Sequence, residues 1–572
     1  MSSQELHTST ESGDVFQQIG LYLPITIEDA EHPSLYQPGG HHPVHIADCL
    51  GDRGQYRVIN KLGTGGFGNA WLCRVLDQEP TKYVAVKILM AHLSNDEDSG
   101  REKRIGRRLL KIAKEDPLIE RYCLLPLDDF TISGPNGVHQ CFVYPVAGPS
   151  TKKIWITVDD QQKTLRNLAA QTAEAMATLH RHGICHGDFR PCNVLLRLNP
   201  LDGMTEEEVI ETLHKPRGCG IHVRDGFPEP GPHAPEYVVQ PIQWDDVNSG
   251  IVSEQICVVD FGEAFEASAA PANGTGIPYP YRAPELALEN KCGFASDIWS
   301  LALTMFMIRI GEPLFTTWDD ELDSFLMGVV DYLGPLPEPW WSTTWGNRKE
   351  QYRDDPDAEG KAVRLTPHPF ENYAPSLRRD MDHTIFQGSQ WGGDPCGYCW
   401  TKMAEEEKDV FEDLIRLMCT LDPGKRPSIE QVLQHPWFSL ELPKAEPESD
   451  SGHEESDYES ACETIYETAY ESQYESGSES EAEPKIRPAI RPETEPGSNK
   501  DTTPDHKAII ETESQSKQPA TEANTKESGL QPQVQPESTP ATTAGARVSH
   551  DLEALVEAEL GTYKQPAEPK SD

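Results

Sequence analysis

The sequence predicts an α+β protein made of three successive parts: an antiparallel sheet with one helix, a mainly helical region, and a disordered acidic tail. Three strand-like runs lie between residues 56 and 89, and a glycine-rich turn separates the first two. Helical patterns dominate after residue 164. From about residue 441, Glu, Ser, Thr, Pro and Gln replace any apolar periodicity, which predicts disorder over 441–572.

The composition limits the classes of function. The 572 residues carry a formal net charge of −44, so we expect basic protein partners and no direct binding to nucleic acid. The 13 cysteines have no repeating spacing, which favours a reducing compartment. The polar start shows no secretory signal, and the longest apolar segment, near 298–310, is too short to span a bilayer. We therefore expect a monomer of the cytoplasm, the nucleus or both, without membrane contact.

Residues 1–55 are expected to form a partly disordered extension. Within it, His41, His42 and His45 stand close together, which alone could suggest a metal site. No cysteine or further histidine follows at ligand spacing, so we favour a loop that lies against the first sheet.

The strands at residues 56–62 and 71–75 flank a G-x-G-x-x-G turn. Glycine backbones turn tightly and let their N–H groups approach phosphates without a Cβ in the way. A dinucleotide-binding turn would lead into a helix, whereas a strand follows here. A third strand at 83–89 places Lys87 among apolar neighbours, which favours a phosphate-binding lysine over a solvent-facing one. The turn itself comprises Gly63, Thr64, Gly65, Gly66, Phe67, Gly68 and Asn69.

A basic helical stretch at residues 99–114 has Glu102 near its start, which is the best candidate to pair with Lys87. Two further strands, at 123–130 and 140–148, flank a turn at 134–137. An amphipathic helix at 164–183 then leads into HGDFRPCNVLL at 186–196.

The second half of the chain contains a series of short motifs in a fixed order. They are DFG at 260–262, YRAPE at 281–285, DIWS at 297–300 and LDPGKRP at 421–427. A lone C-x-x-C at 396–399 could suggest zinc or redox chemistry, but no second pair accompanies it. In the tail, Tyr-Glu-Ser/Thr recurs, which fits either a solvated acidic tail or a regulatory segment.

Taken together, the motifs resemble those of the eukaryotic protein kinases over about residues 56–438. Within that family the chain looks most similar to the SR-protein-kinase-like group of fungi. The finer likeness lies in the lead-in YQPGGHHPV, the HGDFRPCN loop, the DFGEAF and YRAPE strings, and an insert before DFG.

The resemblance implies a bilobal fold, with a sheet and one helix at 56–147 and a mainly helical lobe at 148–438. DFG begins 67 residues after Asn193, which implies an insert at about 199–253, with a helix at 205–214 and a Pro-rich extended piece at 227–241. A second insert, rich in Trp and Pro, is expected at about 335–395.

The resemblance also implies an ATP- and Mg²⁺-dependent Ser/Thr kinase acting on basic, Arg-Ser-rich proteins. Asp188 would orient the substrate hydroxyl, Lys87 held by Glu102 would bind phosphates, and Asn193 and Asp260 would hold Mg²⁺. Tyr144 would guard the back pocket, and Arg426 would pair with Glu285. Besides Lys87 and the turn, the expected ATP-binding residues are Leu62, Ala70, Ala85, Pro145, Ala147 and Leu195.

Four positions depart from the family pattern. Gly187 stands where an arginine would recruit a phosphorylated activation segment, so we expect activity without that phosphorylation. Arg190 replaces a catalytic-loop lysine, keeping its charge in a planar fork. A bridging Ser/Thr is expected to be absent, with Ile277 or Pro278 in its place, and Ala70 replaces a valine over adenine.

These departures leave two hypotheses open. The first is an active kinase, supported by five intact positions: Lys87, Glu102, Asp188, Asn193 and Asp260. The second is a weak or inactive scaffold with a kinase fold, supported by the substitutions and the long acidic tail.

Overall fold

The computed structural model describes residues 22–23, 25–95, 98–152, 161–224, 231–244, 247, 249–315, 321–355, 357–358, 360–366, 375–382, 385–388, 398–401 and 403–441. The chain divides into two units, one of residues 1–442 with 545–572 and one of 443–544, and every described residue belongs to the first. The predicted disordered tail, apart from Glu441, and Cys396 of the C-x-x-C lie outside the described residues.

The first lobe is built on a six-stranded sheet in the order β1-β2-β3-β4-β6-β5, with every neighbouring pair antiparallel. The α+β class with an antiparallel sheet is confirmed. The fifth strand begins at Asp128, later than the sequence predicted, because Leu124 binds the backbone of Val258 instead of the sheet. The strands are β1 (Cys49–Leu50), β2 (Tyr56–Gly65), β3 (Gly68–Val75), β4 (Lys82–Leu89), β5 (Asp128–Gly134) and β6 (Gly137–Pro145).

Side chains alternate between the two faces of this sheet. On β4, Val84, Val86 and Ile88 are buried on one face, where Val44 and Ile46 of the N-terminal extension pack against them. The expected loop against the first sheet is therefore confirmed. Ala85 and Lys87 alternate with these residues and belong to the opposite face, which borders the second lobe.

A buried ion pair also fastens the extension to the sheet. Lys61 of β2 has no exposed side-chain area and binds Glu31, which also accepts a hydrogen bond from the Tyr36 hydroxyl. The ring of the neighbouring His41 packs against Tyr36 in a tilted arrangement, with ring centroids 5.6 Å apart. Among the described residues, no group of three or more His, Cys, Asp or Glu side chains could hold a metal ion, so nothing supports a metal at His42 and its neighbours.

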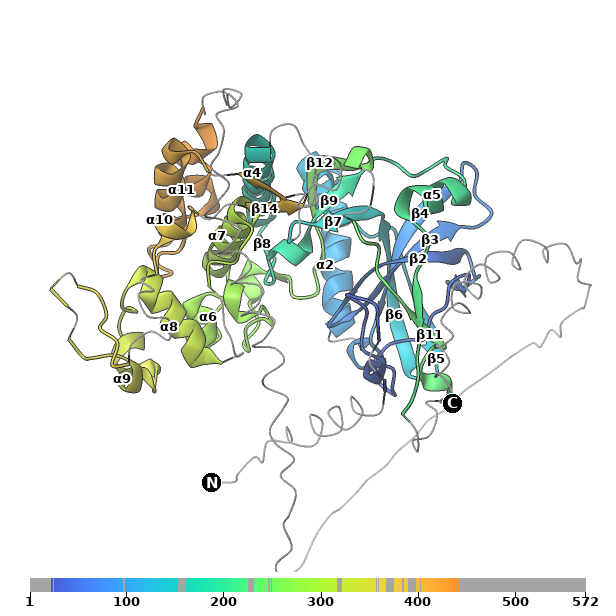
Figure 1. The fold of residues 1–572 in the computed structure, drawn as a ribbon, viewed down its shortest axis with the longest axis horizontal. Helices are drawn as coiled ribbons and strands as arrows, with labels where there is room; N and C mark the ends of the chain where they lie inside the picture. The colour runs from blue at the N-terminus through green and yellow to red at the C-terminus, as the bar shows by residue number, and fades with distance from the viewer. Residues whose placement is uncertain are drawn as a thin grey trace, which may run out of the picture. The chain divides into compact units, whose positions relative to one another are not determined.

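The expected helix after the third strand is present as α2 (Asp98–Ile112). Its Ile105 and Leu109 are fully buried and join the core of the second lobe. The helix therefore bridges the two lobes, and Figure 1 shows it between the sheet and the helical region.

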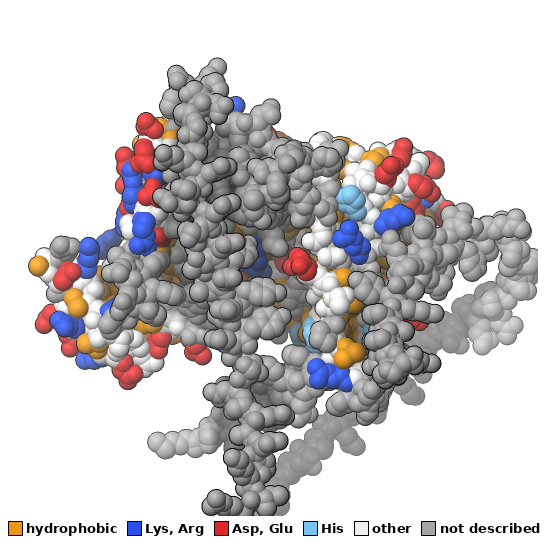
Figure 2. Space-filling view, viewed as in Figure 1, with side chains coloured by type: hydrophobic (Ala, Val, Ile, Leu, Met, Phe, Trp, Pro, Cys, Tyr) orange, Lys and Arg blue, Asp and Glu red, His pale blue; other side chains and the backbone are white. Residues whose placement is uncertain are grey.

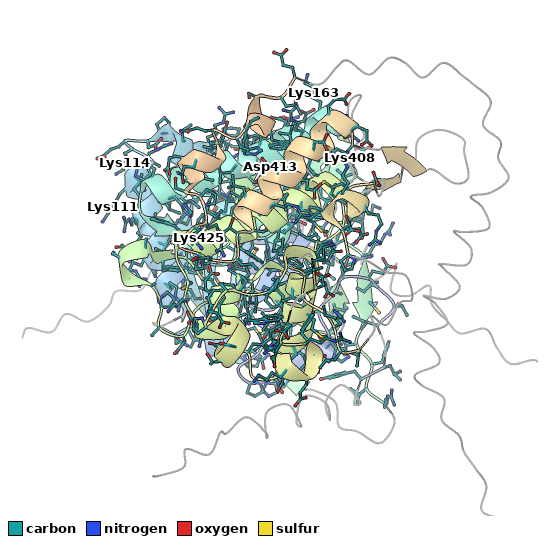
Figure 3. The ribbon with its side chains drawn as sticks, turned by 90° about the vertical axis from the view of Figure 1, so that its left-hand side faces the viewer. Lys111, Lys114, Lys163, Lys408, Asp413 and Lys425 are labelled. Carbon is teal, nitrogen blue, oxygen red and sulfur yellow. The ribbon has the colours of Figure 1, made fainter. Side chains whose placement is uncertain are left out.

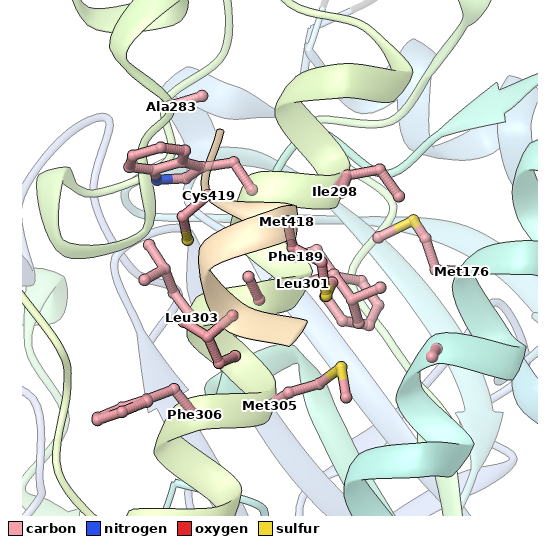
Figure 4. Close-up of a cluster of buried hydrophobic side chains, with 14 of the residues drawn as sticks. Met176, Phe189, Ala283, Ile298, Leu301, Leu303, Met305, Phe306, Met418 and Cys419 are labelled. Carbon is pink, nitrogen blue, oxygen red and sulfur yellow. The ribbon is translucent and has the colours of Figure 1, made fainter. Parts of the chain in front are cut away.

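The second lobe is mainly helical, as predicted. Its centre is α7 (Phe294–Ile310), in which every residue from Ser296 to Ile310 is buried. Figure 4 shows Ile298, Leu301 and Met305 of α7 packed with Met176 and Phe189. Around it lie α4 (Gln161–Arg181), α6 (Pro284–Glu289), α8 (Leu322–Leu333), α11 (Glu405–Met418) and α12 (Ile429–Val432).

Other elements of this lobe are short. They are α3 (Pro117–Tyr122), α9 (Arg348–Gln351), α10 (Leu377–Asp380), β14 (Ile385–Gly388) and β15 (Tyr398–Thr401). The predicted insert at 335–395 is not wholly peripheral, because its Trp340, Trp345 and Tyr352 are buried in the helical core. On α11, Asp413 is exposed on the outer side of the lobe, whereas Lys408 of the same helix is buried (Figure 3).

The insert at 199–253 contains the predicted helix, α5 (Glu206–Leu213), which begins with a capping box between Thr205 and Glu208. Part of the predicted extended piece forms β11 (Tyr237–Val239), paired with β10 (Gly218–Gly220). Residues 225–230 lie outside the description.

The position of this insert differs from its assignment to the second lobe. It leaves that lobe after β9 (Val194–Leu198) and returns at β12 (Val252–Val258), but between them it packs on the first lobe. Glu206 binds Arg57 at 2.7 Å and Arg74 at 3.3 Å. Figure 1 shows α5 beside β3 and β4. The apolar contacts join Ile59, Leu72 and Tyr83 of the sheet to Leu201, Val209, Leu213, Ile242 and Val247.

The surface of the described residues carries charges of both signs. Acidic and basic side chains are interspersed over the helical lobe in Figure 2. Among the helices that are described, none is both long and apolar enough to cross a membrane.

Candidate active site

The backbone of the HGDFRPCNVLL loop, residues 186–196, is bound by one buried carboxylate. Asp297, near the start of α7, accepts hydrogen bonds from the backbone N–H groups of His186 at 2.8 Å and Gly187 at 3.1 Å. The ring of His180 on α4 binds the same carboxylate at 3.0 Å. These contacts fix the backbone on which Asp188 is carried, as the family resemblance implied for this Asp.

Gly187 is required by geometry and is not only a missing arginine. Its φ is +77°, a conformation that costs other residues steric strain. A Cβ built at this position would lie 2.5 Å from the carbonyl oxygen of Glu263. Any side chain at residue 187 would therefore have to displace the segment that follows DFG.

As predicted, no Ser or Thr among the described residues bridges Arg190 and the Asp188 carboxylate, but a threonine does lie beside the loop. Thr275 lies against it, and its hydroxyl donates to the Gly187 carbonyl at 2.7 Å. Ile277, one of the two residues expected in that place, is instead buried. Among the described residues, no Ser or Thr hydroxyl binds the Asp188 carboxylate, so the threonine supports the loop backbone and not the acid itself.

Asp188 is 4% exposed and is contacted from two sides. The Nε of Arg190 lies 3.0 Å from both carboxylate oxygens. The Nδ2 of Asn193 donates to the Asp188 carboxylate at 2.7 Å and to its carbonyl at 2.8 Å. Burial raises the pKa of Asp188 above its ordinary value, although Arg190 opposes the shift.

Lys87 joins three elements at the other side of the cleft. Its Nζ lies 3.1 Å from Glu102 on α2, which is the pairing the sequence predicted, and 2.8 Å from Asp260 of DFG, a contact the sequence did not indicate. Burial alone would lower the pKa of Lys87, but the two carboxylates raise it. Burial raises the pKa of Glu102, while Lys87 opposes this rise. The hydroxyl of Tyr144 also donates to Glu102 at 2.7 Å, so this residue steadies the ion pair.

Asp260 is set in a left-handed backbone conformation, with φ +62°. Phe261 beside it is buried against the ring of His186, at 5.3 Å between centroids. Burial alone would raise the pKa of Asp260, but the Lys87 ammonium more than offsets this and the pKa is lowered. The carboxylate is therefore charged at neutral pH.

The donor set beside Asp188 fits Mg²⁺. Asp260 uses Oδ1 for Lys87, and Asn193 uses its amide nitrogen for Asp188. Among the described residues, Asp260 Oδ2 and Asn193 Oδ1 have no hydrogen-bond partner, which leaves two oxygens for a cation. Oxygen ligands suit Mg²⁺, which usually shares its coordination between protein carboxylates and substrate phosphates.

The glycine-rich turn, residues 63–69, borders the cleft through Phe67. A cavity of about 60 Å³ lies between Phe67 of the turn, Lys87, Glu102, Asp188 and Asp260. A Cβ at Gly63 or Gly66 would meet no heavy atom within 4 Å, so these glycines leave open space. Gly68 differs, because a Cβ there would lie 2.1 Å from the Ile88 carbonyl oxygen; it is needed for strand pairing. Thr64 and Asn69 bind each other across the turn at 2.7 Å.

The expected adenine-binding residues fall into two groups. Ala147 and Leu195 lie together in a small apolar cluster with Tyr144. Leu62 packs against the apolar contacts between the sheet and the insert at 199–253. Ala85 lies on the same face of the sheet as Lys87, and Ala70 is the partner of Lys87 in the β3–β4 pairing. Pro145 ends β6 beside Ala85's strand. Sequence reasoning missed three members of the first cluster, Leu124, Cys257 and Val259, although the apolar run before DFG could have indicated the last two.

The C-terminal end of the activation segment is fixed to the helical lobe. Arg426 binds Glu285 through two nitrogens, at 2.6 and 3.1 Å, which is the predicted pair. The fold and the order of these residues define a eukaryotic protein kinase domain.

Comparisons with known proteins agree with this class. A family model described as protein kinase domain matches residues 248–438. The serine/threonine-protein kinase SRPK of Physarum polycephalum is 25% identical over 448 residues, covering 75% of this chain and 93% of that protein. Human dual specificity protein kinase CLK2 is 27% identical over 413 residues, covering 70% and 66%. Human SRSF protein kinase 3 is 34% identical over 174 residues, 30% of each chain. The chain thus contains a protein kinase domain and resembles the SRPK and CLK kinases.

Proposed function

We propose that the chain is an active Ser/Thr protein kinase that transfers the γ-phosphoryl group of ATP to basic, Arg-Ser-rich protein segments. The observation that carries this proposal is the assembled cleft: Lys87 contacts both Glu102 and Asp260, while Asn193 lies against Asp188. Phosphoryl transfer depends mainly on positioning and on charge stabilisation, and this arrangement supplies both.

Each residue has a distinct role in the proposal. Lys87 binds the α- and β-phosphates, and Glu102 keeps its ammonium in place. Asp188 accepts a hydrogen bond from the substrate hydroxyl and takes its proton as the hydroxyl oxygen bonds to the γ-phosphorus. The bond from that phosphorus to the β,γ-bridging oxygen breaks, and ADP leaves. Arg190, fixed on Asp188, adds positive charge near the transferred group.

Asp260 and Asn193 would hold Mg²⁺, which when bound neutralises charge on the phosphates. The glycine-rich turn, residues 63–69, would cover the phosphates. Leu62, Ala70, Ala85, Pro145, Ala147 and Leu195 would surround the adenine.

Two observations support the finer substrate class. The net charge of −44 favours basic partners. One relative is named as a kinase of SRSF proteins. Ten cysteines of the described residues are free thiols, which supports our inference of a reducing compartment, the cytoplasm or the nucleus.

The test is phosphate transfer from ATP to an Arg-Ser peptide by the unphosphorylated full chain. We expect Asp188→Ala to lower the rate by about 10²–10⁴-fold, the usual range for loss of a general base. Asp129→Asn, outside the cleft, is the control. Equal rates for wild type and Asp188→Ala would favour the scaffold hypothesis. A companion peptide with Arg replaced by Ala tests the basic preference, which fails if both peptides react equally.

A further inference from the structure

The activation segment is tied to α2 without any phosphate. Glu263, directly after DFG, accepts a hydrogen bond from Arg101 of α2 at 3.2 Å. The same carboxylate oxygen accepts the backbone N–H of Gly276 at 3.3 Å. One carboxylate therefore joins the helix that carries Glu102 to a segment 13 residues further along the chain.

Both ends of this link lead to catalytic groups. Arg101 immediately precedes Glu102, which holds Lys87. Gly276 immediately follows Thr275, whose hydroxyl binds the carbonyl of Gly187 beside Asp188. The Glu263 carboxylate is thus connected through its two partners to the neighbours of Lys87 and Asp188, and its side chain lines the same cavity as they do.

A second pair runs parallel to the first. Arg108, two turns along α2, binds Glu266 and also donates to the carbonyl of His182 at 2.8 Å. Glu266 belongs to β13 (Phe265–Glu266), which pairs with β8 (Ile184–Cys185) directly before the catalytic loop. Lys111 of the same helix and Lys114, just after its end, lie at the surface (Figure 3), and no described residue forms an ion pair with them.

We propose that Glu263 is a positioning residue that replaces a phosphorylated side chain as the anion linking α2 to the activation segment. This inference rests on the proposed kinase activity. A phosphate would need cationic partners, and Gly187 removes the arginine that the catalytic loop would supply. The Glu263 carboxylate needs only Arg101 and one backbone N–H, both of which the fold already brings to it.

Glu263 is partly buried, so its ion pair with Arg101 can contribute to the position of α2. Its side chain is 25% exposed, as is that of Arg101, so solvent screens this pair less than a fully exposed one. Burial raises the pKa of Glu263, while Gly276 and Arg101 oppose the rise. Losing the charge would leave Arg101 without its acid and would loosen both ends of the link together.

The decisive variant is Glu263→Gln, which keeps the shape and an oxygen for Gly276 but removes the charge that binds Arg101. We expect kcat to fall about tenfold or more, because α2 no longer holds Glu102 and Lys87 in one arrangement. The thermal midpoint is expected to stay close to wild type. Amide hydrogen exchange should become faster in residues 98–112 and 263–276.

Asp129→Asn is the matched control. Asp129 binds Lys103 on the same helix, with similar side-chain exposures of 28% and 30%, but it belongs to β5 and not to the activation segment. We expect its kcat to stay within about twofold of wild type, as for an ordinary surface pair. If Glu263→Gln behaves like Asp129→Asn in kcat and in exchange, the proposal is wrong.

A double-mutant cycle separates the link from general damage. Arg101→Gln should lower kcat as Glu263→Gln does, and the double variant should lose little more than either single variant. Full additivity would show that the two residues act independently and would overturn the proposal. A loss of kcat that merely tracks a loss of folded protein would overturn it as well.

The proposed function can fail separately. If the wild-type chain transfers no phosphate, the kinase proposal fails on that result alone. The link is then tested by exchange in α2 and by Mg·ATP affinity in calorimetry, comparing Glu263→Gln with Asp129→Asn. Equal exchange and equal affinity in the two variants would reject the link too.

Discussion

Two lysines of the same sheet have opposite surroundings. Lys61 on β2 has no exposed side-chain area and faces a single acid, Glu31, which is itself 1% exposed. Lys87 on β4 keeps 19% of its side chain exposed and faces two acids, Glu102 and Asp260. The first pair is closed and balanced in charge, whereas the second is open to the cleft and has an excess of negative charge.

The difference distinguishes a structural ion pair from a catalytic one. Burial lowers the pKa of Lys61, and the nearby Glu31 carboxylate only partly offsets this effect. The charged pair is therefore kept in place at a cost in desolvation. For Lys87, the two acids outweigh burial and raise its pKa. The unbalanced charge at Lys87 suits a cation that brings phosphates with it, while the pair at Lys61 leaves no room for a ligand. Four experiments can break or sharpen this comparison.

The largest effect is expected for Lys87→Met. Without the ammonium, the phosphates lose their main protein contact, and we expect kcat to fall by about 10²–10³-fold, the range seen when one charge-stabilising donor is removed. Steady-state phosphate transfer measures this. Mg·ATP turnover within about threefold of wild type would contradict the role given to Lys87.

Lys61→Met should show the reverse. It leaves the Glu31 carboxylate buried without a cation, which costs about 3–5 kcal/mol of unfolding free energy. Urea denaturation measures the loss, and kcat per folded molecule should not change. The double variant Lys61→Met/Glu31→Gln should recover much of the stability. A stable Lys61→Met protein with reduced kcat would place this lysine in the catalytic machinery instead.

Lowering the pH should reduce the folding stability contributed by the N-terminal extension before it changes the charges in the cleft. Burial lowers the pKa values of His41 and His42 to about 4, from an ordinary value of 6.5. The unfolded chain therefore takes up protons first, so stability is full above pH 6.5 and falls as pH drops toward 4. A shift of about 2.5 pKa units corresponds to about 3.4 kcal/mol per group below pH 4, of which about 2 kcal/mol is lost by pH 5. Glu31, Lys61, His92 and His139 surround His41, while Asp48 and His139 surround His42.

Urea denaturation between pH 8 and pH 5 measures this loss. The variant His42→Phe should flatten the profile, since it removes one of the two depressed groups. Identical pH profiles for the variant and wild type would show that these histidines do not control acid stability.

The smallest effect is expected at Gly187. Gly187→Ala meets both a positive φ and the Glu263 carbonyl, and we expect a loss of about 1–3 kcal/mol. Gly203→Ala is the matched control, because its φ is +89° but no heavy atom lies within 4 Å of the added Cβ. Equal losses in the two variants would show that backbone strain alone matters at residue 187.

The sequence predicted the parts of the site that are encoded locally. Asp188, Asn193 and Asp260 stand in short motifs, and helical spacing identified Glu102 as the partner of Lys87. These residues are brought together because each motif ends a strand or begins a helix of fixed geometry.

What the sequence could not predict depends on contacts between distant segments. No local pattern shows that the Thr275 hydroxyl reaches Gly187, or that Glu263 reaches Arg101. The positive φ of Gly187 was equally hidden, because a glycine is compatible with any backbone conformation. The placement of the insert at 199–253 was missed for the same reason, since its apolar residues could have packed on either lobe.

That placement bears on the order in which the chain can fold during synthesis. The sheet is complete in sequence at Pro145, but much of the apolar packing of Ile59, Leu72 and Tyr83 comes from residues between Leu201 and Val247. A nascent chain emerging from the ribosome would therefore expose this apolar surface until roughly a hundred more residues were made. The first lobe is best regarded as a unit that reaches its final state late, after the catalytic loop has already been translated.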